Sequence, residues 1–237
     1  EKLNTWNGQK HNWSSDYATI RREKDSPTIY GIVVNDDKML GKDWKICKVG
    51  YTGISTGTDT GNRMEKVMEK TKKEKKQDKY KDASIIFKLP IHSTDSSRIR
   101  KTEERIRLNV GWKLDKELVK KLRLPNETEW ILTKQEYLDS LKEGIRGKKG
   151  DQQTVTTNIF KEKKDLKFKK YMTDQFSAAT DKTGLTLEKW MNKKIPPWLE
   201  LRPAQTTNGD KQQENKFAVY QKGYLPDKLQ EMLQKFD

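Results

Sequence analysis

Two charged side chains occupy positions from which they could bind ions. Arg63 follows two candidate N-caps, Asp59 and Thr60, at the start of a predicted helix. In the first helical turn, a guanidinium and the free backbone N–H groups can face one anion together, so Arg63 suits a phosphate. Glu103 falls on the apolar face of a later predicted helix, where a carboxylate is costly unless it is paired or binds a cation.

The segments before Arg63 predict a β-hairpin. T-I-Y-G-I-V-V begins at Thr28, and W-K-I-C-K-V-G-Y-T begins at Trp44; both are rich in the residue types that favour strands. The polar stretch between them is short enough for an antiparallel connection. Lys48 can therefore lie near Tyr30 if it projects to the same face of the hairpin.

The elements after Arg63 complete a mixed domain. We expect a third strand over 84–90 and a helix over 93–110, in which Ile99, Ile106 and Val110 share a face with Glu103. A short helix over 115–124, a fourth strand over 129–132 and a helix opened by a Thr133/Glu136 capping box and closed by Gly144 follow.

Three further helices are predicted after a polar, glycine-containing linker over 145–158. The chain thus divides into an amino-terminal arm (1–26), a domain (27–146) and a mostly helical carboxy-terminal extension (147–237). The expected fold class is α+β, with a small central antiparallel sheet flanked by helices.

Charge favours a polyanionic partner. The 237 residues include 50 Lys and Arg against 35 Asp and Glu, a formal net charge of +15. Such a balance promotes non-specific phosphate contacts, and no long apolar run or basic amphipathic helix points to a membrane. Nucleic acid is the expected partner.

Cys47 is the sole cysteine, so the sequence holds no disulfide framework and no cysteine-based zinc site. A small buried hydrophobe is the preferred interpretation of its position within a predicted strand. We expect a reducing, intracellular setting, in the cytoplasm or in the nucleus of a eukaryote.

The order of these residues resembles the GIY-YIG nuclease family, in particular its phage and restriction-enzyme branches. The GIY motif of the family corresponds here to Thr28-Ile-Tyr-Gly31, and the YIG motif corresponds to Lys48-Val-Gly50. A predicted helix that carries Arg63 follows. The resemblance covers roughly residues 27–143. It implies a GIY-YIG-like fold and a DNA endonuclease that depends on Mg²⁺ or Mn²⁺.

The resemblance also implies roles for individual residues. Tyr30 would be the general base, Arg63 the phosphate clamp and Glu103 the carboxylate ligand of the metal. An ordinary tyrosine has a pKa of about 10 and is a poor base at neutral pH. A nearby cation such as Lys48 is therefore needed to favour the ionised phenol. Tyr51 departs from the commonest family pattern and is expected to bond the same water or phosphate.

The metal carboxylate has two candidates. Glu103 fits the helix that follows the third strand, whereas Glu129, in T-E-W-I, resembles an E-W-[FI] element of the phage branch. We rank Glu103 first and Glu129 second. Each of these residues also has an ordinary structural interpretation, and only their order along the chain favours the catalytic one.

Contacts to DNA are expected from outside the catalytic domain. Arg21 and Arg22 lie in the arm, and the extension offers basic and aromatic candidates: Lys193, Lys194, Trp190 and Trp198. Removal of 147–237 is therefore expected to weaken DNA binding.

Two other functions remain open from sequence. A non-catalytic nucleic-acid-binding module would need the basic surface alone, and an RNA-cleaving toxin would use the same residues. Double-stranded DNA is the preferred substrate, and a homodimer would explain how one site cuts both strands.

Overall fold

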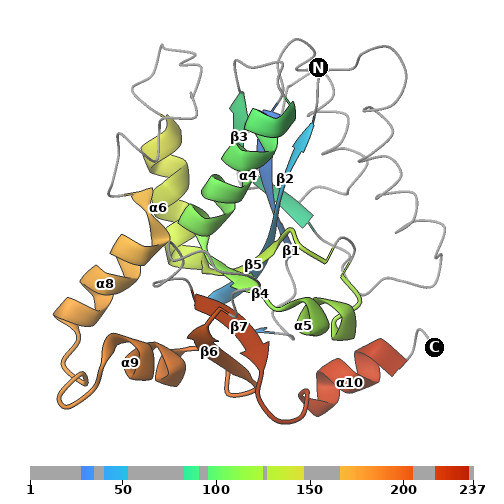
Figure 1. Ribbon diagram of the computed structural model, residues 1–237. Helices are drawn as coiled ribbons and strands as arrows, with labels where there is room; N and C mark the ends of the chain where they lie inside the picture. Colours follow the sequence, from blue (N-terminus) through green and yellow to red (C-terminus); the bar gives the residue numbers. More distant parts are fainter. Residues whose placement is uncertain are drawn as a thin grey trace.

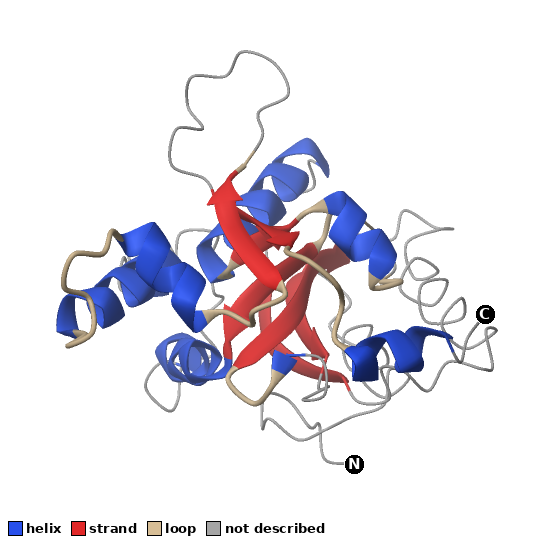
Figure 2. Cartoon of the chain, turned by 90° about the horizontal axis from the view of Figure 1, so that it is seen from below, coloured by secondary structure: helices blue, strands red, loops and turns tan. Residues whose placement is uncertain are grey.

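The computed structural model of this chain describes residues 28–34, 40–52, 83–90, 96–124, 127–146, 166–204 and 217–234. Within these ranges, seven strands form one mixed sheet, and six helices lie around it (Figures 1 and 2). The strands are β1 (Thr28–Val34), β2 (Trp44–Thr52), β3 (Ala83–Pro90), β4 (Trp112–Leu114), β5 (Trp130–Lys134), β6 (Leu199–Pro203) and β7 (Phe217–Gln221). The helices are α4 (Ser96–Val110), α5 (Lys116–Lys121), α6 (Gln135–Arg146), α8 (Phe168–Ala178), α9 (Leu187–Lys194) and α10 (Asp227–Gln234).

The predicted hairpin is confirmed. β1 pairs in antiparallel fashion along its whole length with residues 46–52 of β2, and β3 pairs with the other edge of β1. The sheet order is β3-β1-β2-β5-β4-β7-β6, so β2 of the hairpin borders β5, which begins directly after Glu129. Cys47 is fully buried in β2, and this burial raises the pKa of its thiol, which confirms the structural interpretation of this residue.

Helix α4 packs its apolar face against the sheet, as its sequence pattern predicts. Ile99, Ile106 and Val110 recur at helical spacing, and all three are buried in the core with Glu103 among them. In Figure 1, α4 runs alongside the strands of the hairpin, and its contacts to β2, β4 and β5 hold it there.

The expectation of a small antiparallel sheet is wrong in two respects. The carboxy-terminal extension adds β6 and β7, and β7 pairs in parallel with β4, with Lys113 opposite Ala218. Short strands such as L-E-L-R-P carry little periodicity of their own, and their pairing with a distant segment leaves no local signal. In its described part, the extension thus carries two strands beside the helices α8, α9 and α10.

Aromatic side chains join the extension to the amino-terminal strands. Trp112 lies 5.8 Å from Trp44 and 4.8 Å from Phe168 between ring centroids. The indole of Trp44 also donates to the backbone oxygen of Lys194 at 2.9 Å. The sheet and this core are thus shared across the boundary predicted at residue 146, which adjoins a segment (147–165) outside the described residues.

Helix α6 begins differently from the prediction. Thr133 lies in β5, and its hydroxyl donates to the backbone oxygen of Val110 at 2.9 Å, so it is not the expected cap of α6. Gly144 does not close this helix, which continues to Arg146. A Cβ at Gly144 would lie 2.4 Å from a methyl carbon of Leu166, so close packing explains this glycine.

Candidate active site

The register of the hairpin places Tyr30 and Lys48 on the same face. Tyr30 lies opposite Gly50, and Ile32 lies opposite Lys48. Directly opposed residues in an antiparallel pair share a face, and side chains two residues apart on one strand do as well. Lys48 is therefore a diagonal neighbour of Tyr30, as the proposed activation of the phenol requires.

Gly50 makes room for the phenol of Tyr30. A Cβ at position 50 would lie 2.7 Å from the Tyr30 hydroxyl oxygen and 2.9 Å from Cζ, closer than carbon approaches either atom. The Tyr30 side chain is buried, so it has little room to retreat. The glycine of K-V-G thus sets the position of the phenol.

Lys48 is a buried cation with an acidic partner. Lys48 is 2% exposed, and its Nζ lies 3.2 Å from Oε2 of Glu129. The side chain of Glu129 is about a quarter exposed. The backbone oxygen of Glu129 accepts from the amide of Val49 at 2.9 Å, which fixes the start of β5 beside β2. The second-ranked carboxylate therefore lies at the candidate site as well.

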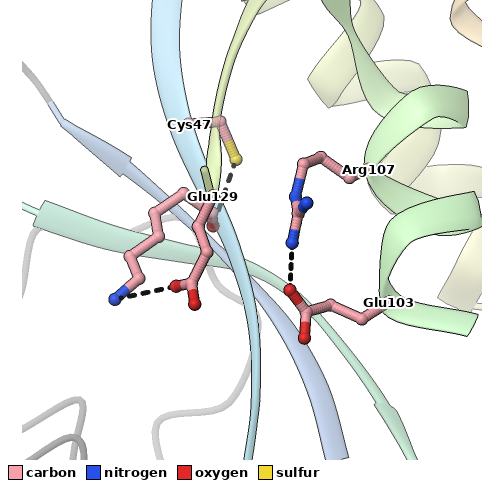
Figure 3. Close-up of polar contacts among 5 residues, drawn as sticks. Cys47, Glu103, Arg107 and Glu129 are labelled. Carbon is pink, nitrogen blue, oxygen red and sulfur yellow. Dashed lines mark hydrogen bonds and ion pairs between the residues drawn. The ribbon is translucent and has the colours of Figure 1, made fainter. Parts of the chain in front are cut away.

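Glu103 is held in the core by an arginine one helical turn later. Glu103 is 6% exposed and Arg107 is 7% exposed, and Nη2 of Arg107 donates to Oε1 of Glu103 (Figure 3). Such a pair supplies the partner that a carboxylate among isoleucines needs. Nε of Arg107 is buried without a hydrogen-bond partner in the described part of the chain.

The electrostatics of Glu103 connect it to the hairpin. Burial raises the pKa of Glu103 to about 7, and Arg107 partly opposes this shift. The charge of Glu129 raises the pKa further, whereas that of Lys48 lowers it. Figure 3 shows the carboxylates of Glu103 and Glu129 on either side of the β2 ribbon. Lys48 with Glu129 and Arg107 with Glu103 are therefore two separate ion pairs, which influence each other through their charges.

Tyr51 lies on the opposite face of the hairpin from Tyr30, because the side chains of β2 alternate. Its hydroxyl oxygen accepts a long hydrogen bond of 3.4 Å from Nε of Arg100, in the first half of α4. This hydrogen bond raises the pKa of Arg100, and the charge of Glu103 contributes in the same direction. A catalytic role for Tyr51 stays a prediction, and its observed partner is an arginine.

Arg100 and Arg107 were not singled out from the sequence. Both read as ordinary arginines of a charged helix, in which Glu-to-Arg pairs four residues apart are common on the surface. The sequence did contain a feature that predicts the role of Arg107. A carboxylate on an apolar helix face needs a positively charged partner, and Arg107 lies one helical turn after Glu103.

Three predicted residues lie outside the described residues: Arg21, Arg22 and Arg63. Their roles stay predictions. The two basic candidates of the extension are exposed, but Lys194 pairs with Asp181 at 2.6 Å and covers the ring of Trp190. Lys193, also in α9, lies on the surface.

Trp190 and Trp198, predicted to contact DNA, lie in the core instead of on the surface. They are 5% and 7% exposed and belong to the apolar core, so neither ring is available for stacking on a base. The indole of Trp190 instead donates to Asp181 at 2.9 Å. The aromatic residues of this region stabilise the extension.

Glu103 and Glu129 are the two carboxylates that could hold a hard divalent cation. Arg107 bonds Oε1 of Glu103 and Lys48 pairs with Oε2 of Glu129, so neither of these pairs uses the second oxygen of its carboxylate. Carboxylate oxygens are the ligands that Mg²⁺ and Mn²⁺ prefer, and Mg²⁺ commonly takes one or two of them together with water and substrate oxygens. No group of three or more His, Cys, Asp or Glu side chains suited to a metal is found in the described ranges.

None of the described helices is long and apolar enough to cross a membrane. Comparison with known proteins gave no match to a family model, to a curated protein or to a solved structure.

Proposed function

We propose that this chain is a divalent-metal-dependent endonuclease that hydrolyses phosphodiester bonds in DNA with a GIY-YIG-like site. One observation carries the proposal: the register of the hairpin places Lys48 on the face of Tyr30, and Nζ of Lys48 lies 3.2 Å from Oε2 of Glu129. A buried lysine on the face of the candidate base and a buried carboxyl group with a raised pKa are costly for stability, and such groups gather at functional sites.

Tyr30 is assigned as the general base. Water attacks the phosphorus and forms the new P–O bond, Tyr30 takes the proton of that water, and the bond to the leaving oxygen breaks. Lys48 favours the ionised phenol through its positive charge on the same face of the hairpin. Gly50 leaves room for the phenol at this position because it lacks a Cβ.

Glu103 is assigned as the carboxylate that would hold Mg²⁺ or Mn²⁺, with Glu129 as the second choice. When bound, the cation supplies positive charge to the developing charge on the leaving oxygen. Arg107 stabilises the ionised form of Glu103 in the buried site. The phosphate clamp remains assigned to Arg63 from the sequence resemblance.

Cleavage of supercoiled plasmid with Mg²⁺ or EDTA tests this function. We expect nicking by the wild type with Mg²⁺, and its loss in EDTA and in Tyr30→Phe and Glu103→Gln. Glu104→Gln is the matched control, because Glu104 is an exposed neighbour on the same helix. Each variant is first checked for a native unfolding transition.

Two outcomes would change the assignment. An active Glu103→Gln beside an inactive Glu129→Gln would move the metal carboxylate to Glu129. A wild type that binds DNA and never cuts it with any divalent cation would favour a non-catalytic binding module, and cleavage restricted to RNA would favour a ribonuclease.

A further inference from the structure

Arg100 lies where helix α4 meets the end of β2. Its side chain is exposed, and its Nε donates to the hydroxyl of Tyr51. Tyr51 is itself half-buried and packs against the apolar core. The guanidinium is therefore attached to the sheet through a side chain that is anchored in the protein.

Arg100 adjoins the candidate metal carboxylate. It precedes Glu103 by three residues, and side chains at this spacing are neighbours on a helix surface. The charge of Glu103 also contributes to raising the pKa of Arg100. Arg105 is exposed on the same helix but lies about 140° around the axis from Arg100, at about 100° per residue.

The bond to Tyr51 uses one of the five N–H groups of the guanidinium. The four N–H groups on Nη1 and Nη2 form the fork that matches two oxygens of a phosphate. Anchoring Nε reduces the rotamer freedom that an exposed arginine loses on binding. An exposed, oriented fork beside a buried carboxylate suits the backbone of a polyanion.

We propose that Arg100, oriented by Tyr51, binds a backbone phosphate of duplex DNA next to Glu103. The inference rests on the proposed function and deepens it, because it assigns a DNA-backbone contact to the helix that carries Glu103. Tyr51 then acts as a positioning residue for Arg100, which accounts for its place on the face away from Tyr30.

The test measures duplex DNA binding by fluorescence anisotropy in EDTA, across a series of salt concentrations. We expect Arg100→Gln to bind about tenfold more weakly, as for loss of one charged hydrogen-bonded contact. The slope of log affinity against log salt should fall by about 0.9, the value for one phosphate contact on B-DNA. Arg105→Gln is the matched control and should leave this slope unchanged.

Tyr51→Phe separates positioning from folding. It should weaken binding less than Arg100→Gln does, and the double variant should bind no more weakly than Arg100→Gln alone, because both act through one contact. Additive losses in the double variant would overturn the positioning role.

Failure of the inference can be told apart from failure of the proposed function. If Arg100→Gln and Arg105→Gln show the same affinity and salt slope while the wild type cuts plasmid, Arg100 is not a phosphate ligand and the nuclease assignment stands. If the wild type neither binds nor cuts DNA, both proposals fall.

Discussion

The guanidinium of Arg107 bonds the carboxylate of Glu103 inside the core, and each side chain is only 8% exposed. Both residues come from one helix, four positions apart, so the pair forms with α4 itself. A charge pair at this depth adds little to stability in total, yet each charge depends on the other.

Replacing Arg107 with Met should destabilise the fold. The change leaves Glu103 buried without its partner, and breaking a buried pair in this way costs about 3–5 kcal/mol. Urea unfolding measures the loss. The double variant Glu103→Leu/Arg107→Met should recover most of it, because no charge is left buried; a single variant as stable as the wild type would contradict this account.

Stability should fall as pH rises through the range in which Glu103 titrates. The pKa of Glu103 is raised from 4.5 to about 7, so the native state binds a proton more tightly than the unfolded chain does. The stabilisation is complete below pH 4.5 and is lost as pH rises to about 7, and it amounts to about 3 kcal/mol.

Urea unfolding at pH 5 and pH 8 checks this sign in the wild type and in Glu103→Gln. Gln cannot titrate, so the variant should lack this part of the pH dependence. The same slope in both proteins would show that other groups are responsible.

Gly50→Ala should impair cleavage more than it impairs folding. The new Cβ would meet the hydroxyl of Tyr30 at 2.7 Å, so the phenol must move from its position. Overpacking of this kind typically costs about 1–3 kcal/mol. Cleavage rate and melting temperature are measured together. Adding Tyr30→Phe removes the oxygen nearest the new Cβ, so it should recover part of the stability and leave the protein inactive.

Gly31→Ala provides a contrast on the other face of the hairpin. A Cβ there would lie 2.3 Å from the ring of Phe87, which is fully buried and has no space to move. We expect a loss of stability of about 1–3 kcal/mol or more. Phe87→Leu should relieve it, and a melting temperature equal to that of the wild type would contradict the clash.

The sequence was sufficient for the hairpin and for the inward position of Glu103, because both follow from local periodicity. Lys48 was expected near Tyr30 only if it shared a face, and the register of β1 and β2 satisfies this condition. Arg107 was missed because its type and spacing match those of any surface pair.

The missed strands have a different cause. β4 has three residues, and its partner β7 lies in a segment with no local link to it. Because the extension supplies strands to the sheet, removal of 147–237 would expose the edge of β4, and a loss of DNA binding could then follow from misfolding alone. Single variants such as Lys193→Gln therefore test the role of the extension in DNA binding more directly.

The parallel pairing of β4 with β7 also affects the order of events during synthesis. Lys113 and Ala218 are about a hundred residues apart, so β4 leaves the ribosome long before its partner strand exists. Until residues 217–221 are made, the nascent chain carries an unpaired sheet edge, which is a known route to aggregation. Pauses in translation after β4, or scarcity of chaperones, should therefore lower the yield of folded protein more than that of a chain whose strands all pair with near neighbours.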